Sequence, residues 1–304
     1  MLMRATLPRH LMVLLPGTVL AAVLLWAYWP VMSGLAERWY DDPQYSHGFL
    51  VPLFAAFLLW RRRDRLLAAR RAPSWLGVPL LLTAGLMRVI GGYYYSPWLE
   101  QMSLLPALAG LTLVAWGSAA LAAAGPALAF LIFMVPLPGR LDKALAGPLQ
   151  QAATLAATNV LQTLGLFAQS EGNVILLSDY ELGIVEACSG LRMLTVFLAT
   201  SAAVALLMQR SLRQRVIVVL SAVPVALLCN VTRIAVTGVM HETVGHEIAN
   251  RVYHNLAGWL MAPLALACLA AELLILGRLF ITEPEAPLSP AQPRRTAIPG
   301  AMST

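Results

Sequence analysis

Charged residues are scarce in this chain. Only 12% of its 304 residues are Asp, Glu, Lys or Arg, whereas 59% are hydrophobic, and the mean hydropathy is +0.71. This balance is far from that of a soluble domain and excludes that class. Apolar runs of roughly 18 to 22 residues recur along the chain, each long enough to cross a hydrocarbon core of about 30 Å as a helix. The sequence therefore predicts a polytopic membrane protein.

Cysteine is also rare. Cys188, Cys229 and Cys268 are an odd number and form no CxxC pair, so neither a disulfide framework nor a zinc site can be read from them. The chain has no glycine-rich phosphate loop and no repeat of solenoid period. Cys229 and Cys268 fall inside apolar helices, where we interpret them as small packing residues.

Two histidines near position 245 invite a metal-site interpretation that their spacing does not support. His241 and His246 stand beside Glu242 and Glu247, but HExxH spacing is absent. A separation of five residues does not align two ligands on one helix. We therefore expect no metal and no cofactor.

The apolar runs predict an all-α membrane domain of about eight transmembrane helices over residues 1–281. The stretch from Met102 to Pro138 is too long for one crossing, and we place a break at Gly125-Pro126 because proline lacks an amide donor. The first apolar run has no small-residue cleavage site, so we expect a retained helix rather than a signal peptide. The predicted helices cover about 11–30, 46–60, 75–93, 102–123, 125–138, 188–208, 216–238 and 255–279.

The basic residues predict the orientation of these helices. With eight spans, 14 of the 21 Lys and Arg fall on one side, including "RRRDRLLAARR" (61–71) and "QRSLRQR" (209–215), and four fall on the other. The positive-inside rule makes the first side cytoplasmic, with both termini. The net charge of +6 thus reflects membrane topology, and we expect no nucleic-acid partner. The Pro-rich tail 282–304 is expected to be disordered. The Ala/Leu/Arg-rich, Lys-poor composition suggests a GC-rich bacterial genome, and we expect the chain in the bacterial inner membrane.

The longest predicted external segment is 139–187. Its first half carries Gln150, Thr154, Thr158 and Gln162 at four-residue spacing, a polar stripe on a helix. This amphipathic helix could lie on the outer membrane surface or turn its stripe toward a polar groove between helices. The second half has two β-rich runs around Ser178 and predicts a small hairpin leading into the sixth helix.

Three reactive residues from separate helices fall at one predicted depth, the external rim. Cys188 begins the sixth helix, Arg233 lies near the external end of the seventh, and His254 begins the eighth. A helix N-terminus and a nearby cation favour the nucleophilic thiolate. An imidazole can take the thiol proton and return it to a leaving amine, and an arginine can stabilise an oxyanion.

Each of these residues also has an ordinary structural interpretation. Cys188 could be a packing residue, Arg233 could extend to the interface, and His254 could cap a helix. Arg233 lies inside an apolar helix, however, where a charge is functional by default. The placement of all three on one face favours a shared site.

Neighbouring residues are weaker candidates. Glu186 could orient the histidine or pair with Arg233, or be a solvated loop carboxylate. Asn230 shares the helix face of Arg233 and could hydrogen-bond across the bundle. Ser46 and His47 lie at the external start of the second helix, where we favour a hydrogen-bonded structural role over catalysis.

The set of motifs resembles the exosortase/archaeosortase family of polytopic membrane cysteine transpeptidases. The resemblance rests on "EACSGL" (186–191), "NVTRIAVTG" (230–238) and "HNLAGW" (254–259), supported by "YSHGFLVP" (45–52) and "FMVPLP" (133–138). It implies that Cys188 is the nucleophile, Arg233 the oxyanion-stabilising or positioning cation and His254 the proton-transfer partner. Ser189 and Asn255, inside these motifs, are supporting candidates.

The resemblance also implies the substrates. They would be exported proteins with a C-terminal signal made of a Pro-Glu-Pro-like motif, one transmembrane helix and a basic end, often in bacteria that make exopolysaccharide. The enzyme would cut near the motif on the periplasmic side through a thioester. Two rival functions stay open: a transporter or lipid-linked glycan handling protein, suggested by the intramembrane Arg88 and Arg233, and a noncatalytic scaffold for export.

Overall fold

Helices account for most of the structure. The computed structural model describes residues 9–178, 180–184, 190–245, 264, 266–271, 273–274 and 278. In chain order the first half contains α1 (Arg9–Asp41), the 3₁₀ helix η1 (Pro43–Phe49), α2 (Leu50–Arg61), α3 (Arg63–Ala68), α4 (Gly77–Tyr93), α5 (Pro97–Met102), α6 (Leu104–Trp116), α7 (Ser118–Phe130) and η2 (Leu131–Met134). The second half contains α8 (Gly139–Thr163), β1 (Gln169–Glu171), β2 (Val174–Leu176), β3 (Glu181–Gly183), α9 (Leu191–Leu207), α10 (Leu212–Leu220) and α11 (Ala222–Val244).

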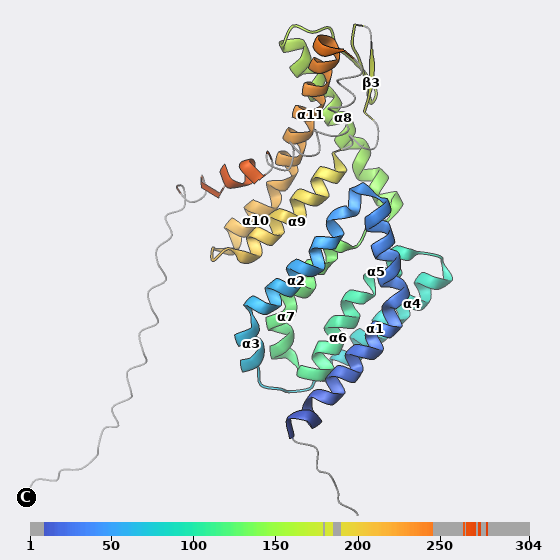
Figure 1. Ribbon diagram of the computed structural model, residues 1–304, viewed down its shortest axis with the longest axis vertical. Coiled ribbons are helices and arrows are strands. Elements are labelled where there is room, and N and C mark those ends of the chain that lie inside the picture. Colours follow the sequence, from blue (N-terminus) through green and yellow to red (C-terminus); the bar gives the residue numbers. More distant parts are fainter. Residues whose placement is uncertain are drawn as a thin grey trace, which may run out of the picture.

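The first seven α-helices form one bundle, against which α9 packs (Figure 1). Its core joins α1, α2 and α7 through buried residues such as Leu35, Leu58 and Ala127. On α9, Ala202 and Leu206 pack against this core. Small residues let membrane helices approach closely, which suits the Ala-rich sequence of α7. The bundle thus fixes the position of α9.

The break in the long apolar stretch lies at Gly117, so the predicted break at Gly125-Pro126 is wrong. Gly117 has φ +90°, and a Cβ there would collide with the carbonyl oxygen of Ala72. Only glycine satisfies both conditions at low cost. Pro126 instead lies inside α7, because a membrane helix tolerates the missing donor when neighbouring groups satisfy the freed carbonyl.

Long apolar helices confirm a mainly helical membrane protein. In the described part of the chain, α5 with α6 and α10 with α11 are long and apolar enough to cross a membrane. The pair α7–η2 and α8 would make a third span, although the chain bends by 78° between them. The helices α4 and α9 are apolar but shorter. The total of eight spans therefore stays a prediction.

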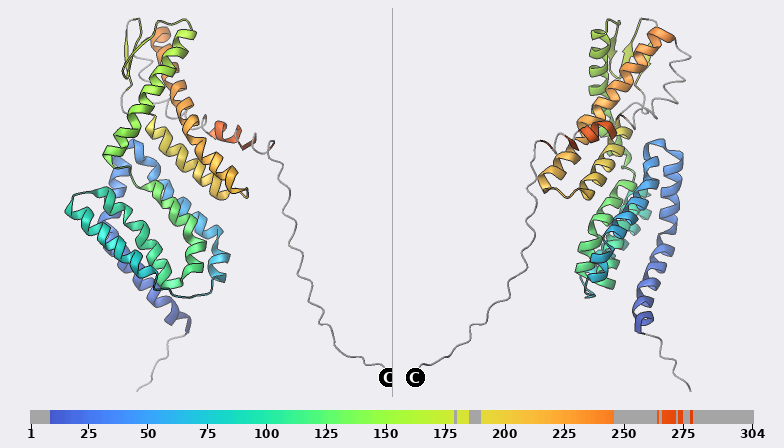
Figure 2. Two further views of the ribbon diagram at one scale, coloured as in Figure 1. Left: turned by 180° about the vertical axis from the view of Figure 1, so that it is seen from behind. Right: turned by 60° about the vertical axis from the view of Figure 1, so that its left-hand side comes forward.

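The helices α8 and α11 pack side by side and, with the sheet, project beyond the rest of the described structure (Figures 1 and 2). Of the predicted polar stripe, Gln150, Thr154 and Thr158 are buried, while Gln162 is exposed. Both threonine hydroxyls donate to the carbonyl four residues earlier, and Asn173 donates to the Gln150 side chain at 2.7 Å. The stripe is therefore turned into the protein rather than displayed on a membrane surface.

The predicted hairpin is confirmed as β2 and β3, and β1 adds a third antiparallel strand. In this hairpin Ile175 of β2 pairs with Leu182 of β3, and both side chains are buried against α8 and α11. The hairpin is tied to the end of α11: Tyr180 stacks on His241 with ring centroids 4.3 Å apart, and the Ser178 amide donates to Glu242. His241 and Glu242 therefore have structural roles.

The described residues contain no group of three or more possible metal ligands. His246 and Glu247 lie outside the described residues, as does the tail 282–304.

Candidate active site

The N-terminus of α9 lies directly against α11. Gly190, which precedes α9, has φ +74°, and a Cβ placed on it would lie 3.1 Å from the side-chain nitrogen of Asn230. Glycine at this position supplies the left-handed backbone and leaves room for the asparagine. The contact joins "EACSGL" to "NVTRIAVTG", two of the motifs singled out in the sequence.

Arg233 lies one helical turn after Asn230 on the same face of α11. Its Nη2 donates to Asn230 Oδ1 at 2.9 Å, and the two side chains are only 9% and 1% exposed. The carbonyl of Arg233 accepts from the Thr237 hydroxyl at 2.9 Å. A guanidinium held in a buried position beside the N-terminus of α9 creates an electropositive site suited to an oxyanion or a thiolate.

The expectation that Arg233 lies near the end of its helix is wrong. The helix α11 continues to Val244, well beyond the predicted end at 238. It continues because the hairpin holds His241 and Glu242, as described above. Arg233 therefore lies in the interior of α11, at the level where the start of α9 packs against it.

His47 lies in η1, which connects α1 to α2 outside both helices and contacts α9. Among the described residues, its Nδ1 atom is buried with no hydrogen-bond partner. Burial lowers the pKa of His47, the positive charge of Arg192 at the start of α9 lowers it further, and the backbone of Phe133 and Gln44 opposes the shift. The lowered pKa favours the neutral form of the His47 imidazole, which lies near the N-terminus of α9.

A polar network that the sequence analysis missed holds η1 in place. Asp42 caps η1 by accepting from the Gln44 amide, and the Gln44 side chain and the Tyr45 hydroxyl both donate to Asp142 on α8, at 2.8 and 3.0 Å. Burial, followed by the Asp142 charge, raises the pKa of Tyr45 to about 12. The tyrosine of "YSHGFLVP" was a visible signal, but nothing in one sequence indicates that Asp142 is its partner.

The described structure brings together Gly190, Asn230 and Arg233, and places His47 and Arg192 close to the same end of α9. Cys188, His254, Glu186, Ser189 and Asn255 lie outside the described residues. The predicted convergence of thiol, guanidinium and imidazole therefore stays a prediction.

The remaining candidates occupy ordinary positions. Cys229 is completely buried and packs with Phe197, Ala222 and Ala226. Arg88 on α4 is stacked over the ring of Tyr28 at 4.7 Å, a cation–π contact within the first bundle.

Comparison with known families supports the interpretation of the motifs. A family model for transmembrane exosortases matches residues 39–271. No curated protein and no solved structure matches the chain.

Proposed function

Because the chain belongs to the transmembrane exosortase family, we propose that it is a cysteine protease or transpeptidase that cleaves exported proteins at a C-terminal sorting signal. In this proposal Cys188 is the nucleophile, His254 transfers protons and Arg233 stabilises the oxyanion. The observation that carries the proposal is the contact of Gly190 with Asn230, one helical turn from the buried Arg233.

Chain connectivity supports the role of Cys188. Two residues of extended chain span at most about 7 Å, so Cys188 is tethered within that distance of Gly190, which touches Asn230. A thiol near a helix N-terminus and a guanidinium has a stabilised thiolate form. The short chain separation between Cys188 and Gly190 thus supports the proposal that the nucleophile works beside the electropositive site.

The proposed reaction has two stages. The Cys188 sulfur attacks the scissile carbonyl carbon while His254 accepts the thiol proton, and the resulting oxyanion is stabilised by Arg233. His254 then gives that proton to the leaving amine, the C–N bond breaks and a thioester forms. An amine or water then attacks the thioester carbonyl carbon while its proton passes to His254. The C–S bond breaks to release the product, and His254 returns the proton to the sulfur, which restores the thiol.

Asn230 would act as a positioning residue in this scheme. Its oxygen holds one nitrogen of Arg233, which fixes the guanidinium plane before substrate arrives. Donors fixed in this way stabilise a developing charge without reorganisation during the reaction. Arg192 would add to the positive potential near the scissile segment, and the imidazole of His47 would add a hydrogen-bonding group there.

The proposed setting is the bacterial inner membrane, with eight spans, both termini in the cytoplasm and the site at the periplasmic rim. A lateral surface of the bundle would hold the transmembrane helix of the substrate. The two basic clusters assigned to one side do lie together, since Arg62, Arg65 and Arg215 line one cavity, which supports this orientation.

The rival transporter function is less well supported. It was suggested by two intramembrane arginines, but α4 packs on α5 and α6, whereas α11 packs on α8, α9 and α10. Arg88 is engaged with Tyr28, and Arg233 with Asn230. Two arginines in different helix groups do not make one anion site.

The test is coexpression of the full chain with a tagged exported protein that ends in a Pro-Glu-Pro motif, a transmembrane helix and basic residues. Wild-type enzyme should shorten the tag-bearing protein, and Cys188→Ala should abolish processing. Cys229→Ala is the matched control, because its buried thiol lies in a packing cluster. Equal processing by wild type and Cys188→Ala would refute the proposal. Mass spectrometry of a hydroxylamine-treated reaction should also reveal the hydroxamate expected from a thioester.

A further inference from the structure

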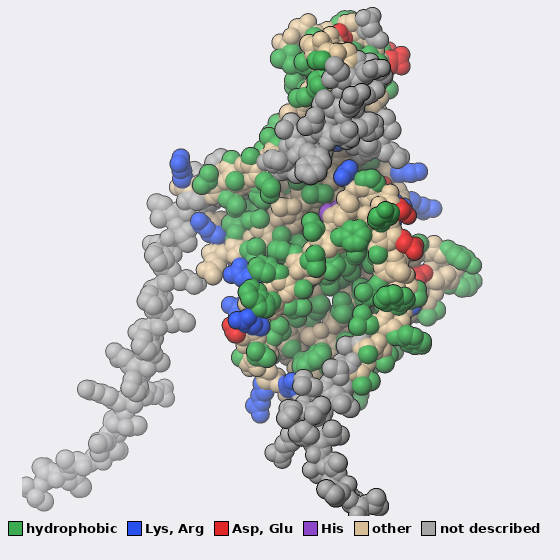
Figure 3. Space-filling model, viewed as in Figure 1, with side chains coloured by type: hydrophobic (Ala, Val, Ile, Leu, Met, Phe, Trp, Pro, Cys, Tyr) green, Lys and Arg blue, Asp and Glu red, His purple; other side chains and the backbone are tan. Residues whose placement is uncertain are grey.

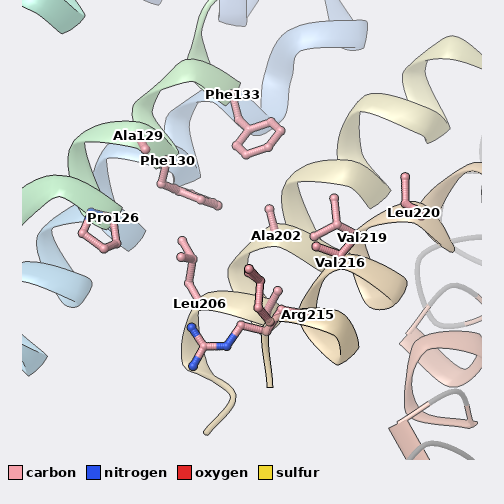
Figure 4. Close-up of a pocket in the computed structure, with 12 residues that line it drawn as sticks. Pro126, Ala129, Phe130, Phe133, Ala202, Leu206, Arg215, Val216, Val219 and Leu220 are labelled. Carbon is pink, nitrogen blue, oxygen red and sulfur yellow. The ribbon is translucent and has the colours of Figure 1, made fainter. Parts of the chain in front are cut away.

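An open apolar groove separates α7 and η2 from α9 and α10. Its volume is about 410 Å³, and Figure 4 shows Phe130 and Phe133 on one side facing Ala202, Val216 and Val219 on the other. Leu206 and Arg215 lie together at one end of the groove. Apart from Arg215 its lining is apolar, so an acyl chain could occupy it without leaving polar groups unsatisfied.

A second, polar cavity of about 200 Å³ continues from that end and shares Leu206 and Arg215 with the groove. Three more arginines line it, all from the region of α2 and α3: Arg61, Arg62 and Arg65. Among the residues that the structure describes, no carboxylate lines this cavity. Figure 3 shows Lys and Arg side chains following this edge of the molecule.

Backbone carbonyls orient two of these guanidiniums. Arg215 donates through Nη2 to Met208 O at 2.8 Å and through Nε to Arg210 O at 3.1 Å, and Arg62 donates to Ala123 O at 3.4 Å. Burial lowers the pKa of Arg62, and the charges of Arg65 and Arg215 lower it further. Like charges brought this close oppose one another, and an anion between them would relieve the repulsion.

We propose that the arginine cavity and the apolar groove form one binding site for an anionic phospholipid, with the phosphate among the guanidiniums and an acyl chain in the groove. Arginine forks bind phosphate oxygens in bidentate fashion. Basic pockets between membrane helices on the cytoplasmic side are a known way to hold such headgroups.

The positive-inside rule alone does not explain this arrangement. Topology requires basic residues on the right side of the membrane. It does not require that Arg62, between α2 and α3, and Arg215, in α10, line one cavity and be oriented by carbonyls. A guest transmembrane helix is a poorer occupant, because its basic end would meet four guanidiniums. The charge of the cavity therefore selects a lipid with a phosphate headgroup, independently of the proposed peptidase chemistry.

The test uses the full chain, purified in a neutral detergent, and titrations followed by native mass spectrometry. The probes are dioleoylphosphatidylglycerol, dioleoylphosphatidylcholine and inorganic phosphate. We expect retained phosphatidylglycerol, at least tenfold weaker phosphatidylcholine binding and little competition by phosphate. Equal binding of both lipids would overturn the proposal. Full competition by inorganic phosphate would contradict the part of the proposal that places an acyl chain in the groove.

Matched variants separate the two parts of the site. Arg62→Gln with Arg215→Gln should weaken phosphatidylglycerol binding by about tenfold or more, since each change removes a cation that would attract the phosphate. Arg70→Gln with Arg71→Gln removes the same charge from the same basic stretch outside the cavity and should bind like wild type. Ala129→Trp, at an exposed groove position, should reduce lipid binding with the arginines intact.

A crosslink keeps the proposal testable if the double variant does not fold. A photoreactive amino acid at Val216, in an otherwise wild-type chain, should crosslink to a phosphatidylglycerol acyl chain. A crosslink to the substrate helix in place of lipid, or equal weakening by the Arg70 and Arg71 changes, would contradict the proposal.

Discussion

The side-chain oxygen of Asn230 accepts a hydrogen bond from the guanidinium of Arg233 at 2.9 Å, and both groups are buried. A buried hydrogen bond to a charged group contributes about 1.5–3 kcal/mol. Asn230→Leu keeps the branched shape of the side chain but removes the acceptor, so substrate processing should fall about ten- to hundredfold. The measurement is the processing rate of the tagged substrate. Thr232→Val is the control, because Thr232 is exposed on the same helix and bonds its own backbone; a rate equal to this control would contradict the role of Asn230.

Arg233→Gln should lower the rate of processing by about 10²–10³, the usual effect of removing one oxyanion donor. Arg88→Gln should change it little, because Arg88 is stacked on Tyr28 in another helix group. Rates measured at matched expression test both. Comparable losses in the two variants would favour the anion-transport interpretation over peptidase chemistry.

Gly190→Ala should impair processing more than stability. The added Cβ would lie 3.1 Å from Asn230 Nδ2. The alanine would also have to adopt φ +74°, a conformation that costs about 1 kcal/mol for a residue with a side chain. The result would be a shift of the α9 start relative to α11. Gly125→Ala, with nothing within 4 Å of its Cβ, is the matched control. Processing rate and thermal unfolding are measured in parallel, and wild-type processing by Gly190→Ala would exclude the contact from the site.

Tyr45→Phe and Asp142→Asn should each destabilise the protein by about 1 kcal/mol. Their effects should not be additive, because the two side chains share one hydrogen bond at 3.0 Å. A double-mutant cycle on thermal or denaturant unfolding in detergent measures the coupling. A coupling energy of zero would mean that this bond does not hold η1 to α8.

Acid should weaken the fold through His47. Its pKa in the folded protein lies below the ordinary value of about 6.5, so the unfolded chain binds a proton more readily. The contribution of neutral His47 is therefore complete above pH 6.5 and is lost as the pH falls toward the folded pKa. His47→Gln should flatten the decline in thermal stability between pH 7 and 5. An unchanged decline would show that other groups cause it.

The sequence could predict features that depend on local composition. Apolar runs indicate helices, the alternation around Ser178 indicates the hairpin, and the basic clusters 61–71 and 209–215 indicate a shared side. The structure confirms the hairpin and brings these two clusters to one cavity. Each feature depends on neighbouring residues or on a charge asymmetry that the membrane itself imposes.

Other features depend on distant contacts and could not be read from the chain. The break at Gly117 depends on the nearby carbonyl of Ala72, which makes this glycine, and not the one at 125, the turning point. The extension of α11 beyond Arg233 depends on the stacking of Tyr180 on His241. His241 looks like a loop residue in the sequence because its stacking partner, Tyr180, is 61 positions away.

The candidate site was predicted in part. The motifs identified Asn230 and Arg233, whose hydrogen bond the structure contains. The Tyr45 to Asp142 bond and the approach of Arg192 to His47 were missed. Such pairs involve residues about 100 to 150 positions apart, and a single sequence does not record which distant side chains meet.

The 78° bend between α7–η2 and α8 lets α8 cover one flank of the candidate site. It sends α8 along α11, where Leu161 fills the space beside Gly238, so this flank of α11 is walled off. Under the proposed function, a substrate polypeptide would reach Arg233 from the side of η1 and the first turn of α9, which α8 leaves uncovered. The bend between η2 and α8 thus determines which flank of α11 is covered, although it lies almost 100 residues before Arg233 in the sequence.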